Sequence, residues 1–413
     1  MGAALSSKQR LDKALGDQFP LNERFFGLEN FGNTCYANSV LQALYYCTPL
    51  RKHCLEHTLH RGTSGAGSRG EDGVQQEEDD LLECLCNLFH SISTQKRRCG
   101  VHAPRRFVQR LRAENEVFNN QMHQDAHEFL NYLLNEMAGI LEKRNKIGVE
   151  RNGTRSGTDG EDGTANPRMG DTAGIGYGNC GRRHSGSSAG SSGSSGGSES
   201  VNTKTWIHSI FEGVLTNETR CLECDSVTSR DESFLDLSLE IEQNSSVSAC
   251  MRSFSAIESL RGENKFYCDA CCSLQEAHKR MRIKKLPNVL AIHLKRFKYI
   301  EQLQRFKKLS YCIAFPFELK LSNVVEATGV PDRKYELFAV IVHSGSGPNH
   351  GHYVALVRSH QHWLCFDDDV VDLIDESQIP AYFGASSETA GSTDTGYLLF
   401  YQAEQWEEPT EGF

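Results

Sequence analysis

The chain lacks the long apolar segment of a membrane-spanning protein and the positive charge of a nucleic-acid binder. No run approaches eighteen consecutive apolar residues, and the N-terminus has no apolar core of a secretory signal. Lys and Arg number 44 against 54 Asp and Glu, a net charge of −10 over 413 residues. These absences argue against a membrane-spanning protein, a secreted protein and a partner of nucleic-acid phosphates, and they favour a basic protein partner.

The chain has 15 cysteines but no secretory signal. Thiols outside the secretory pathway stay reduced, so we expect the protein in the cytoplasm, the nucleus or both. Some of these cysteines should therefore be nucleophiles or metal ligands rather than members of disulfides.

Composition divides the chain near residue 145. Residues 151–200 contain 14 glycines and 10 serines and almost nothing apolar, which is typical of disorder. We expect a disordered insertion over 146–203 and a shorter one near 61–78. The rest forms one large domain from regions 25–145 and 204–403, preceded by an extension over 1–24 and followed by a tail over 404–413.

The hydrophobic pattern is helical before the long insertion and strand-like after it. Apolar residues recur at helical spacing over 40–47, 81–92 and 129–141. Runs rich in β-branched and aromatic residues follow at 289–297, 335–344, 352–359, 362–371 and 396–402. This order predicts an α+β fold with separate helical and strand layers, and it disfavours a doubly wound sheet.

Cys35 is a candidate nucleophile at the start of a predicted helix, which Asn33 or Thr34 can cap. A thiol there meets unpaired N–H groups and the positive end of the helix dipole, and both favour the thiolate. Asn30 can offer its amide to a developing oxyanion. The alternative is that Cys35 is a small buried apolar residue, as most free cysteines are.

A candidate base and acid follow more than three hundred residues later. His350 and His352 stand in a Gly-rich loop that leads into a strand, and three aspartates occupy 367–369. With Cys35 they compose the cysteine, histidine and acid of a thiol hydrolase. Spacing alone does not choose between the histidines or among the aspartates, and a loop-tip histidine pair beside a solvated turn remains the alternative.

Two CxxC pairs suggest a structural zinc site. The four residues are Cys221, Cys224, Cys268 and Cys271. Each pair stands at a predicted turn, which suits a tetrahedral four-thiolate site with no open position for catalysis. The 43 residues between the pairs exceed the spacing of compact zinc ribbons, so unrelated turns or a redox pair remain alternatives, and Cys272 is a competing ligand.

Several segments together resemble the ubiquitin-specific proteases. GLENFGNTCYANSVLQAL is similar to their cysteine box, and GPNHGHYVALV with WLCFDDDVV is similar to their histidine box. QDAHEFLNYLL, IHLKRF and GYLLFY are similar to further blocks, in the same order, so the resemblance covers about residues 25–403. It implies a papain-like domain of thumb, palm and fingers, with zinc in fingers spanning about 212–286, that hydrolyses the bond after the C-terminal glycine of ubiquitin.

The resemblance also assigns roles by position. It makes Cys35 the nucleophile and His352 the general base. It makes Asp367 the acid that orients the base, with Asp368 as the runner-up that assists from the next position. Asn30 corresponds to the oxyanion-hole side chain. It implies no organic cofactor.

By the same resemblance, Asp125 and Glu128, three residues apart on the polar face of the predicted helix that carries Phe129, contact the two arginines of the ubiquitin tail. A solvated acidic helix start is the alternative. The glycines expected to let a loop close over the tail glycines are Gly345, Gly347 and Gly351.

The sequence also suggests partners for this protein. The chain is most similar to a subgroup activated by WD40-repeat propeller proteins, which implies low activity alone and stimulation by such a partner at the fingers. MGAALS matches the N-myristoylation pattern at Gly2, and one acyl chain gives at most weak membrane attachment.

A ubiquitin-binding scaffold without turnover conflicts with the intact Cys35, His352 and Asp367. A zinc-dependent interaction module would give the cysteine box and the histidine box no function.

Overall fold

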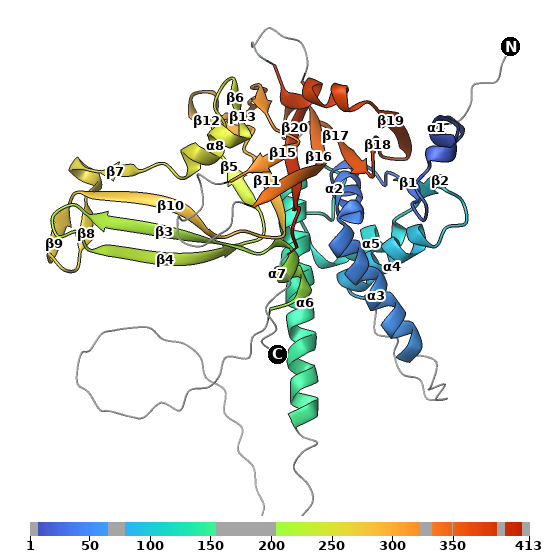
Figure 1. Ribbon diagram of the computed structural model, residues 1–413, viewed down its shortest axis with the longest axis horizontal. Helices are drawn as coiled ribbons and strands as arrows, with labels where there is room; N and C mark the ends of the chain where they lie inside the picture. Colours follow the sequence, from blue (N-terminus) through green and yellow to red (C-terminus); the bar gives the residue numbers. More distant parts are fainter. Residues whose placement is uncertain are drawn as a thin grey trace, which may run out of the picture. The chain divides into compact units, whose positions relative to one another are not determined.

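The computed structural model describes residues 7–64, 79–153, 204–321, 333–348, 350–385 and 393–406. The chain divides into two units, Met1–Leu141 with Lys204–Phe413 and, separately, Glu142–Thr203. The described part of the second unit is the C-terminal end of helix α6 (Ala126–Gly153). The fold and the sites below belong to the first unit (Figure 1). Within the described residues, no helix is both long and apolar enough to cross a membrane.

Helices and one short parallel strand pair form the N-terminal part of the first unit. Its elements are α1 (Ser7–Leu15), β1 (Phe25–Leu28), α2 (Cys35–Tyr46), α3 (Thr48–Ser64), α4 (Leu81–Ser93), β2 (Cys99–His102), α5 (Arg105–Glu114) and α6. In α4, the Asp80 carboxylate accepts a hydrogen bond from the Glu83 N–H at 3.0 Å and caps the first turn. The apolar side chains of α4 are buried, which confirms the helix predicted over 81–92.

The described part of the predicted extension, residues 7–24, packs into the core. Leu11 and Leu15 are buried, and α1 contacts β2 and β19 (Val370–Ile374). The ring of Phe19 lies 4.8 Å from the ring of Phe25, centroid to centroid. The leucines four residues apart give α1 an apolar face that the rest of the domain covers. Residues 1–6, with the Gly2 pattern, lie outside the described residues.

An eight-stranded sheet forms the C-terminal part, in the order β19-β18-β17-β16-β20-β11-β5 with β15 beside β16. Its other strands are β5 (Leu237–Leu239), β11 (Val289–Leu294), β15 (Glu318–Lys320), β16 (Lys334–Gly347), β17 (His350–Ser359), β18 (His362–Asp367) and β20 (Thr395–Ala403). Ala339 and Ile341 of β16 pack with the N-terminal helices, whereas Val340 and Val342 pack in a second core on the other face. Because both faces are covered, the strands are rich in apolar residues. Helical and strand layers are separate, which confirms the predicted α+β fold.

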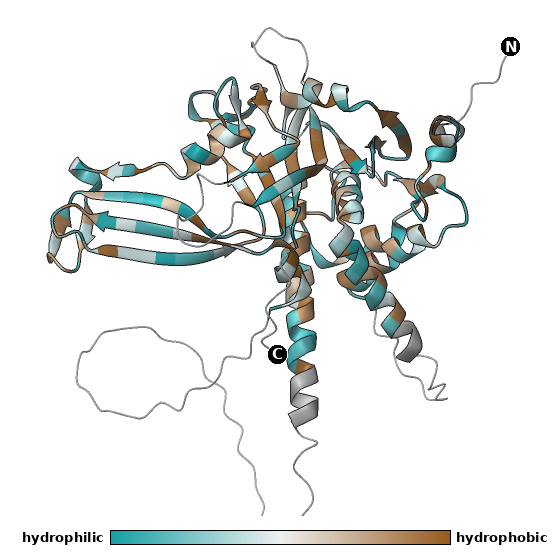
Figure 2. Ribbon diagram, viewed as in Figure 1, coloured by the Kyte–Doolittle hydropathy of each residue, from teal (hydrophilic) through white to brown (hydrophobic). Residues whose placement is uncertain are grey.

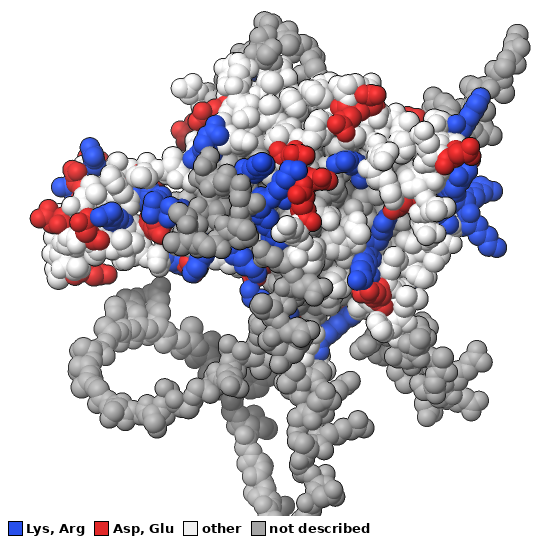
Figure 3. Space-filling model, viewed as in Figure 1, with Lys and Arg blue, Asp and Glu red and all other residues white. Residues whose placement is uncertain are grey.

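A second sheet, with strand order β4-β3-β10-β7, extends from the large one and ends near the β8–β9 hairpin (Figure 1). These strands, which we call the fingers, are β3 (Gly213–Cys221), β4 (Val227–Phe234), β7 (Glu258–Leu260), β8 (Phe266–Cys268), β9 (Ser273–Gln275) and β10 (Ala277–Lys285). β4 is exposed along almost its whole length, and hydrophilic residues dominate the sheet (Figure 2). Charges of both signs cover it (Figure 3), paired as in Arg280–Glu218 and Lys284–Asp231, each at 2.6 Å.

The predicted fingers range of 212–286 is too broad. Between β4 and β7 the chain returns to the large sheet, where β5 pairs with β11. The buried leucines at 237 and 239 explain this return, because the exposed fingers offer them no core. Around them lie α7 (Trp206–Phe211), β6 (Ser245–Ser246), α8 (Val247–Phe254) and β14 (Ile313–Ala314). The fingers are therefore built from two separate segments of the chain.

Two helices continue into the predicted insertions. α3 ends at Ser64, inside the insertion expected near 61–78, and α6 reaches Gly153, inside the one expected over 146–203. The residues after 145 include Lys146 and Ile147, which continue a helix readily, so the glycine-rich composition begins later than the predicted boundary. The remaining parts of both insertions, 65–78 and 154–203, lie outside the described residues.

Candidate functional site

Cys35 is the first residue of α2, and its side chain is 3% exposed. α2 is buried along its whole length and packs against β17 and β16. The predicted side-chain cap is wrong: Thr34 precedes the helix without capping it, and its Oγ1 accepts a hydrogen bond from the Phe31 N–H at 2.9 Å. Asn33, at φ 53°, donates from Nδ2 to the Gln121 carbonyl at 2.6 Å. Both side chains therefore shape the loop that delivers the thiol rather than cap the helix.

His352 and Asp367 meet at the start of β17 and the end of β18, which pair as an antiparallel hairpin. Nε2 of His352 lies 2.6 Å from Oδ1 of Asp367. His352 is also close enough to Cys35 to lower the pKa of its thiol. His350 is exposed and lines a different cavity, of about 820 Å³, beside Arg305. The structure thus separates the two histidines that spacing leaves equivalent.

The protonation of the pair follows from these contacts. Burial raises the pKa of the Cys35 thiol, but hydrogen bonds with His123, His352 and the Tyr353 backbone outweigh it and bring the pKa to about 7. The hydrogen bond with Asp367, followed by that with Cys35, raises the pKa of His352 to about 10. The pair therefore holds a thiolate and an imidazolium between about pH 7 and pH 10.

Asp368 ties the two halves of the site together. Its carboxylate accepts hydrogen bonds at 2.8 Å from the Asn30 and Asn38 side-chain amides, and its carbonyl accepts one from the Leu28 N–H at 2.7 Å. Gly27 permits this approach, because a Cβ there would lie 2.5 Å from the Asp369 carbonyl. Asn38 escaped the sequence analysis, although it stands three residues after Cys35 on the first turn of α2. Asp368 thus fixes the loop that carries Asn30.

Gly351, next to His352, has a structural reason to be glycine. Its φ is 152°, and a Cβ there would lie 2.3 Å from the Ser344 carbonyl oxygen and 2.4 Å from Nε2 of His343. Gly345, at φ 134°, would meet the His350 carbonyl at 2.5 Å. These glycines let the ends of β16 and β17 approach closely around a register shift between Ser344 and Gly347. The close approach sets the position of His352.

Asp125 and Glu128 line a cavity of about 670 Å³ beside the β12 (Phe297–Ile300) and β13 (Arg305–Lys308) hairpin. Asp125 precedes α6 rather than lying on its polar face as expected. Its Oδ1 accepts from the His127 N–H at 2.7 Å and its Oδ2 from the Tyr397 hydroxyl at 2.6 Å. Glu128 is exposed, and partial burial, with the charge of Asp125, raises the pKa of its carboxyl. Glu128 is thus the acid that can turn to a ligand without losing a structural role.

Further side chains of the site were missed from sequence. The rings of His127 and His293 stack at 3.8 Å, and Nε2 of His127 lies 2.7 Å from Oδ2 of Asp236. His123 stacks on Tyr353 at 5.1 Å. In the sequence, the only indication of these side chains was that His123 and His127 stand on either side of Asp125, near the start of α6. Their partners come from distant strands that spacing does not relate.

The four cysteines of the CxxC pairs converge at the end of the fingers, with all sulfurs within 4.8 Å of one another. The Cys221–Cys271 and Cys224–Cys268 sulfur separations are 4.0 and 3.6 Å. A tetrahedral zinc site with 2.3 Å bonds requires about 3.8 Å between sulfurs. Cys272 is exposed and its sulfur donates to the Asp269 carbonyl at 3.3 Å, so it lies outside the cluster. The cluster has the donor set and spacing for one metal ion.

Comparison with known proteins places the chain in a family. The ubiquitin carboxyl-terminal hydrolase family matches residues 26–401. The chain is 53% identical to ubiquitin carboxyl-terminal hydrolase 4 of Arabidopsis thaliana over 403 residues, which are 98% of this chain and 99% of that protein. It is 48% identical to ubiquitin carboxyl-terminal hydrolase 12 of Salmo salar over 404 residues, 98% of this chain and 95% of that protein.

The fold is also similar to solved structures. One is the SAGA Ubp8/Sgf11/Sus1/Sgf73 DUB module bound to ubiquitin aldehyde, with a TM-score of 0.66 and 23% identity over 94% of this chain and 72% of that chain. Another is the SAGA DUB module bound to monoubiquitin, with a TM-score of 0.64 and 23% identity over 98% and 72%. At this identity the likeness shows the fold. By its sequence relatives, the chain belongs to the ubiquitin carboxyl-terminal hydrolase family and is a deubiquitinase.

Proposed function

We propose that Cys35, His352 and Asp367 carry out the hydrolysis after the C-terminal glycine of ubiquitin. The observation that carries this proposal is the contact of a buried thiol, at a helix N-terminus, with an imidazole whose other nitrogen lies 2.6 Å from a carboxylate. That arrangement supplies an activated nucleophile, a proton carrier and a group that orients the carrier.

The mechanism is acyl transfer in two steps. The Cys35 thiolate attacks the carbonyl carbon of the terminal glycine, and His352 gives its proton to the leaving amine. Water then attacks the thioester, His352 takes the water proton, and the thiolate leaves. Asp367 keeps the imidazole oriented throughout.

Asn30 is the proposed oxyanion donor, together with backbone N–H groups at the start of α2. One hydrogen of its amide points to Asp368 at 2.8 Å, which leaves the second for the substrate oxygen. Its Oδ1 is held by the Thr34 N–H at 3.2 Å. Asp368 thus acts as a positioning residue for Asn30, rather than as the orienter of His352.

Replacement of the thiol tests the nucleophile. We expect Cys35→Ala to lower kcat on a ubiquitin-amidocoumarin reporter by at least about 10⁴-fold, because the covalent route is lost. The parent should form a covalent adduct with a ubiquitin C-terminal vinyl sulfone, and the variant should form none. Cys272→Ala, which removes an exposed thiol outside the site, is the control. Tight ubiquitin binding by the parent without an adduct would instead establish the non-catalytic scaffold.

The cavity lined by Asp125 and Glu128 is the proposed channel for the ubiquitin tail. Its carboxylates, of Asp125, Glu128 and Glu240, can pair with the two tail arginines, and Lys295 and Lys298 also line it. Asp125 contributes charge while its oxygens cap α6 and hold Tyr397. Glu128 is the side chain proposed to contact an arginine directly, and Gly351 shapes the opposite strand end.

The charge of Glu128 can be tested without altering the fold. We expect Glu128→Gln to raise KM about fivefold with kcat nearly unchanged, since an exposed ion pair contributes about 1 kcal/mol. Glu136→Gln, on the same helix but outside the cavity lining, should behave like the parent. With a ubiquitin whose tail arginines are replaced by alanine, parent and Glu128→Gln should give the same KM. A fivefold difference that persists there would contradict the contact.

Zinc is the metal proposed for Cys221, Cys224, Cys268 and Cys271. The donor set consists of four thiolates with the spacing of a tetrahedral site. When bound, the ion would cross-link the β3–β4 turn to the β8–β9 hairpin, as a structural and not a catalytic metal.

Metal analysis tests this site with a matched neighbour. The purified parent should contain about one zinc per chain, and Cys224→Ala should lose it and unfold at a lower temperature. Cys272→Ala, at the thiol adjacent to Cys271, should keep both the zinc and the melting temperature. A parent free of zinc after growth in zinc-supplemented medium, or equal loss in both variants, would exclude the assignment.

A WD40-repeat propeller is the activating partner proposed for the fingers. Leu222, Tyr267 and Leu274 are 39%, 55% and 59% exposed beside the cysteine cluster, and Tyr267 faces Leu274 across the β8–β9 pair. We call these three residues the fingertip patch. Exposed apolar residues on an otherwise polar layer are typical of a partner surface.

Activation assays test this partner. Selected WD40-repeat propellers should raise the reporter kcat of the parent, and Tyr267→Ser with Leu274→Ser should reduce that stimulation at least about tenfold without changing the basal rate. Leu59→Ser, an equally exposed leucine on α3, should be stimulated normally. Full activity of the isolated parent, with no stimulation by any propeller, would refute the proposal.

A further inference from the structure

The carboxylate of Asp236 binds two side chains of α6 that lie one helical turn apart. Its Oδ2 lies 2.7 Å from Nε2 of His127, and its Oδ1 accepts a hydrogen bond from Nδ2 of Asn131 at 2.7 Å. Because a carboxylate oxygen only accepts, Nε2 of His127 carries a proton. Asp236 lies between β4 and β5, where the chain leaves the fingers and returns to the large sheet. An acid at the base of the fingers therefore holds the start of the helix that carries Glu128.

The ring of His127 is also held on its face. It stacks on the ring of His293 at 3.8 Å with an interplanar angle of 17°. Burial lowers the pKa of His293 well below its usual value, so this second ring is neutral. Nδ1 of His293 lies 2.9 Å from the hydroxyl of Ser238, its partner on the neighbouring strand β5. Asp236 thus fixes the edge of the His127 ring, and His293 fixes its plane.

The same two histidines hold the donors to Asp125. His127 donates its backbone N–H to Oδ1 of Asp125 at 2.7 Å. The ring of His293 lies 4.9 Å from the ring of Tyr397 at an angle of 77°. Burial raises the pKa of the Tyr397 phenol well above its usual value, so the hydroxyl stays protonated and donates to Oδ2 of Asp125 at 2.6 Å. Both donors to Asp125 therefore belong to residues whose rings pack on His293.

His127 lines two cavities. One, of about 510 Å³, lies on the side of the fingers and is also lined by Asp236 and Asn131. The other is the cavity of about 670 Å³ proposed for the ubiquitin tail, which Asp125 and Glu128 line and Asp236 does not. Asp236 can therefore influence tail binding only through the first turns of α6.

We propose that Asp236 is a positioning residue for recognition of the ubiquitin tail, because it sets the start of α6 so that Asp125 and Glu128 face the two tail arginines. This inference rests on the proposed role of the tail cavity. Both oxygens of Asp236 bind α6, and neither binds the thiol or the base. Its loss should consequently raise KM and leave kcat almost unchanged.

Two variants weaken this contact from opposite sides. Asp236→Asn keeps the size of the side chain but turns an N–H toward one of two donors, so one hydrogen bond is lost. Asn131→Ala removes one donor, keeps the contact of Asp236 with His127 and suits a helix.

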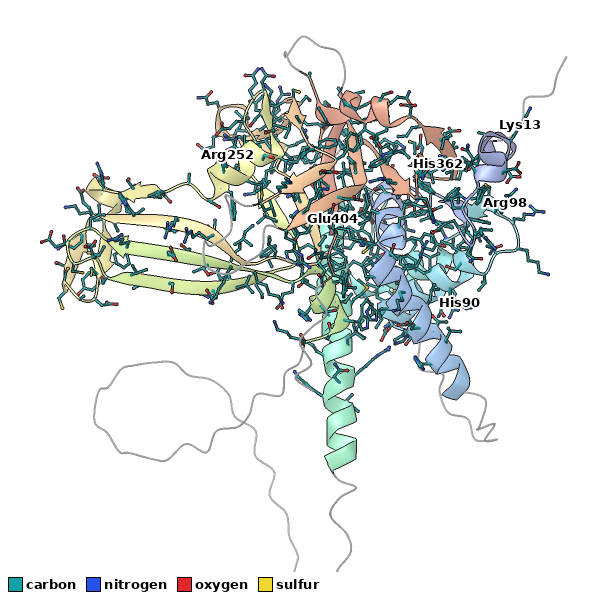
Figure 4. The ribbon with its side chains drawn as sticks, viewed as in Figure 1. Lys13, His90, Arg98, Arg252, His362 and Glu404 are labelled. Atoms are coloured by element: carbon teal, nitrogen blue, oxygen red, sulfur yellow. The ribbon has the colours of Figure 1, made fainter. Side chains whose placement is uncertain are left out.

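Two carboxylates outside this network provide matched controls. Asp231→Asn, on β4, changes an acid whose partners, Thr216 and Lys284, lie within the fingers. Glu404→Gln changes an acid that follows β20 (Figure 4) and binds Lys334. Melting temperatures establish that each variant is folded.

The readout is steady-state hydrolysis of two ubiquitin-amidocoumarin reporters, one with the native tail and one with both tail arginines replaced by alanine. On the native tail, Asp236→Asn should raise KM about tenfold and Asn131→Ala about threefold, with kcat within about twofold of the parent. On the arginine-free tail, both variants should have the KM of the parent. The two control variants should match the parent on both reporters.

A KM like that of the parent in both variants, or a loss that is equal on the two tails, would overturn the role of Asp236. An equal loss is the result expected of a residue that only supports the fold. If Asp236→Asn does not fold, Asn131→Ala decides. Failure of the tail cavity itself is a separate result, because Glu128→Gln would then show no dependence on the tail arginines either.

Discussion

The packing of the first turn of α2 against the first residues of β17 is the constraint on which the site depends. It joins residues 35 and 352, which lie more than three hundred positions apart. The turn between β18 and β19 secures both sides of this junction: Asp367 holds His352, and Asp368 holds Asn30 and Asn38. Two adjacent carboxylates thus bind side chains from different parts of the molecule. The chain reverses direction at Asp368, whose φ is 48°, so the two side chains point in different directions.

The same junction makes a buried thiol acidic. Burial by itself disfavours the thiolate, and Cys47, which is enclosed by apolar neighbours, shows the result, since burial raises the pKa of its thiol to about 12. Cys35 is almost as buried, yet its pKa is about 7 because imidazole and backbone donors surround the sulfur. The difference between the two cysteines lies in the groups around the sulfur, and two of these, His352 and the Tyr353 backbone, belong to β17 near the far end of the sequence.

Local patterns predicted the elements, whereas the roles of the site residues were predicted from the resemblance alone. The apolar spacing of α4 and α6 identified both helices, because burial of one face repeats every turn. Spacing could not separate His350 from His352, since the choice depends on a register shift between β16 and β17. Asp125 hydrogen-bonds both the His127 N–H and the Tyr397 hydroxyl, and His123 stacks on Tyr353. Both tyrosines lie on strands that are far away in the sequence. Such contacts are properties of the tertiary fold, and a single sequence does not display them.

The fingers are stabilised by different interactions from those of the rest of the domain. β4 is exposed on both faces, so this sheet gains little from apolar burial and depends on its backbone ladder and on cross-strand ion pairs such as Arg280–Glu218. Its far end has no core, and the four cysteines are the groups that join the β3–β4 turn to the β8–β9 hairpin. Tyr267 and Leu274 stand on that hairpin. A metal ion held by the four cysteines would therefore also fix the hairpin that carries these two exposed side chains.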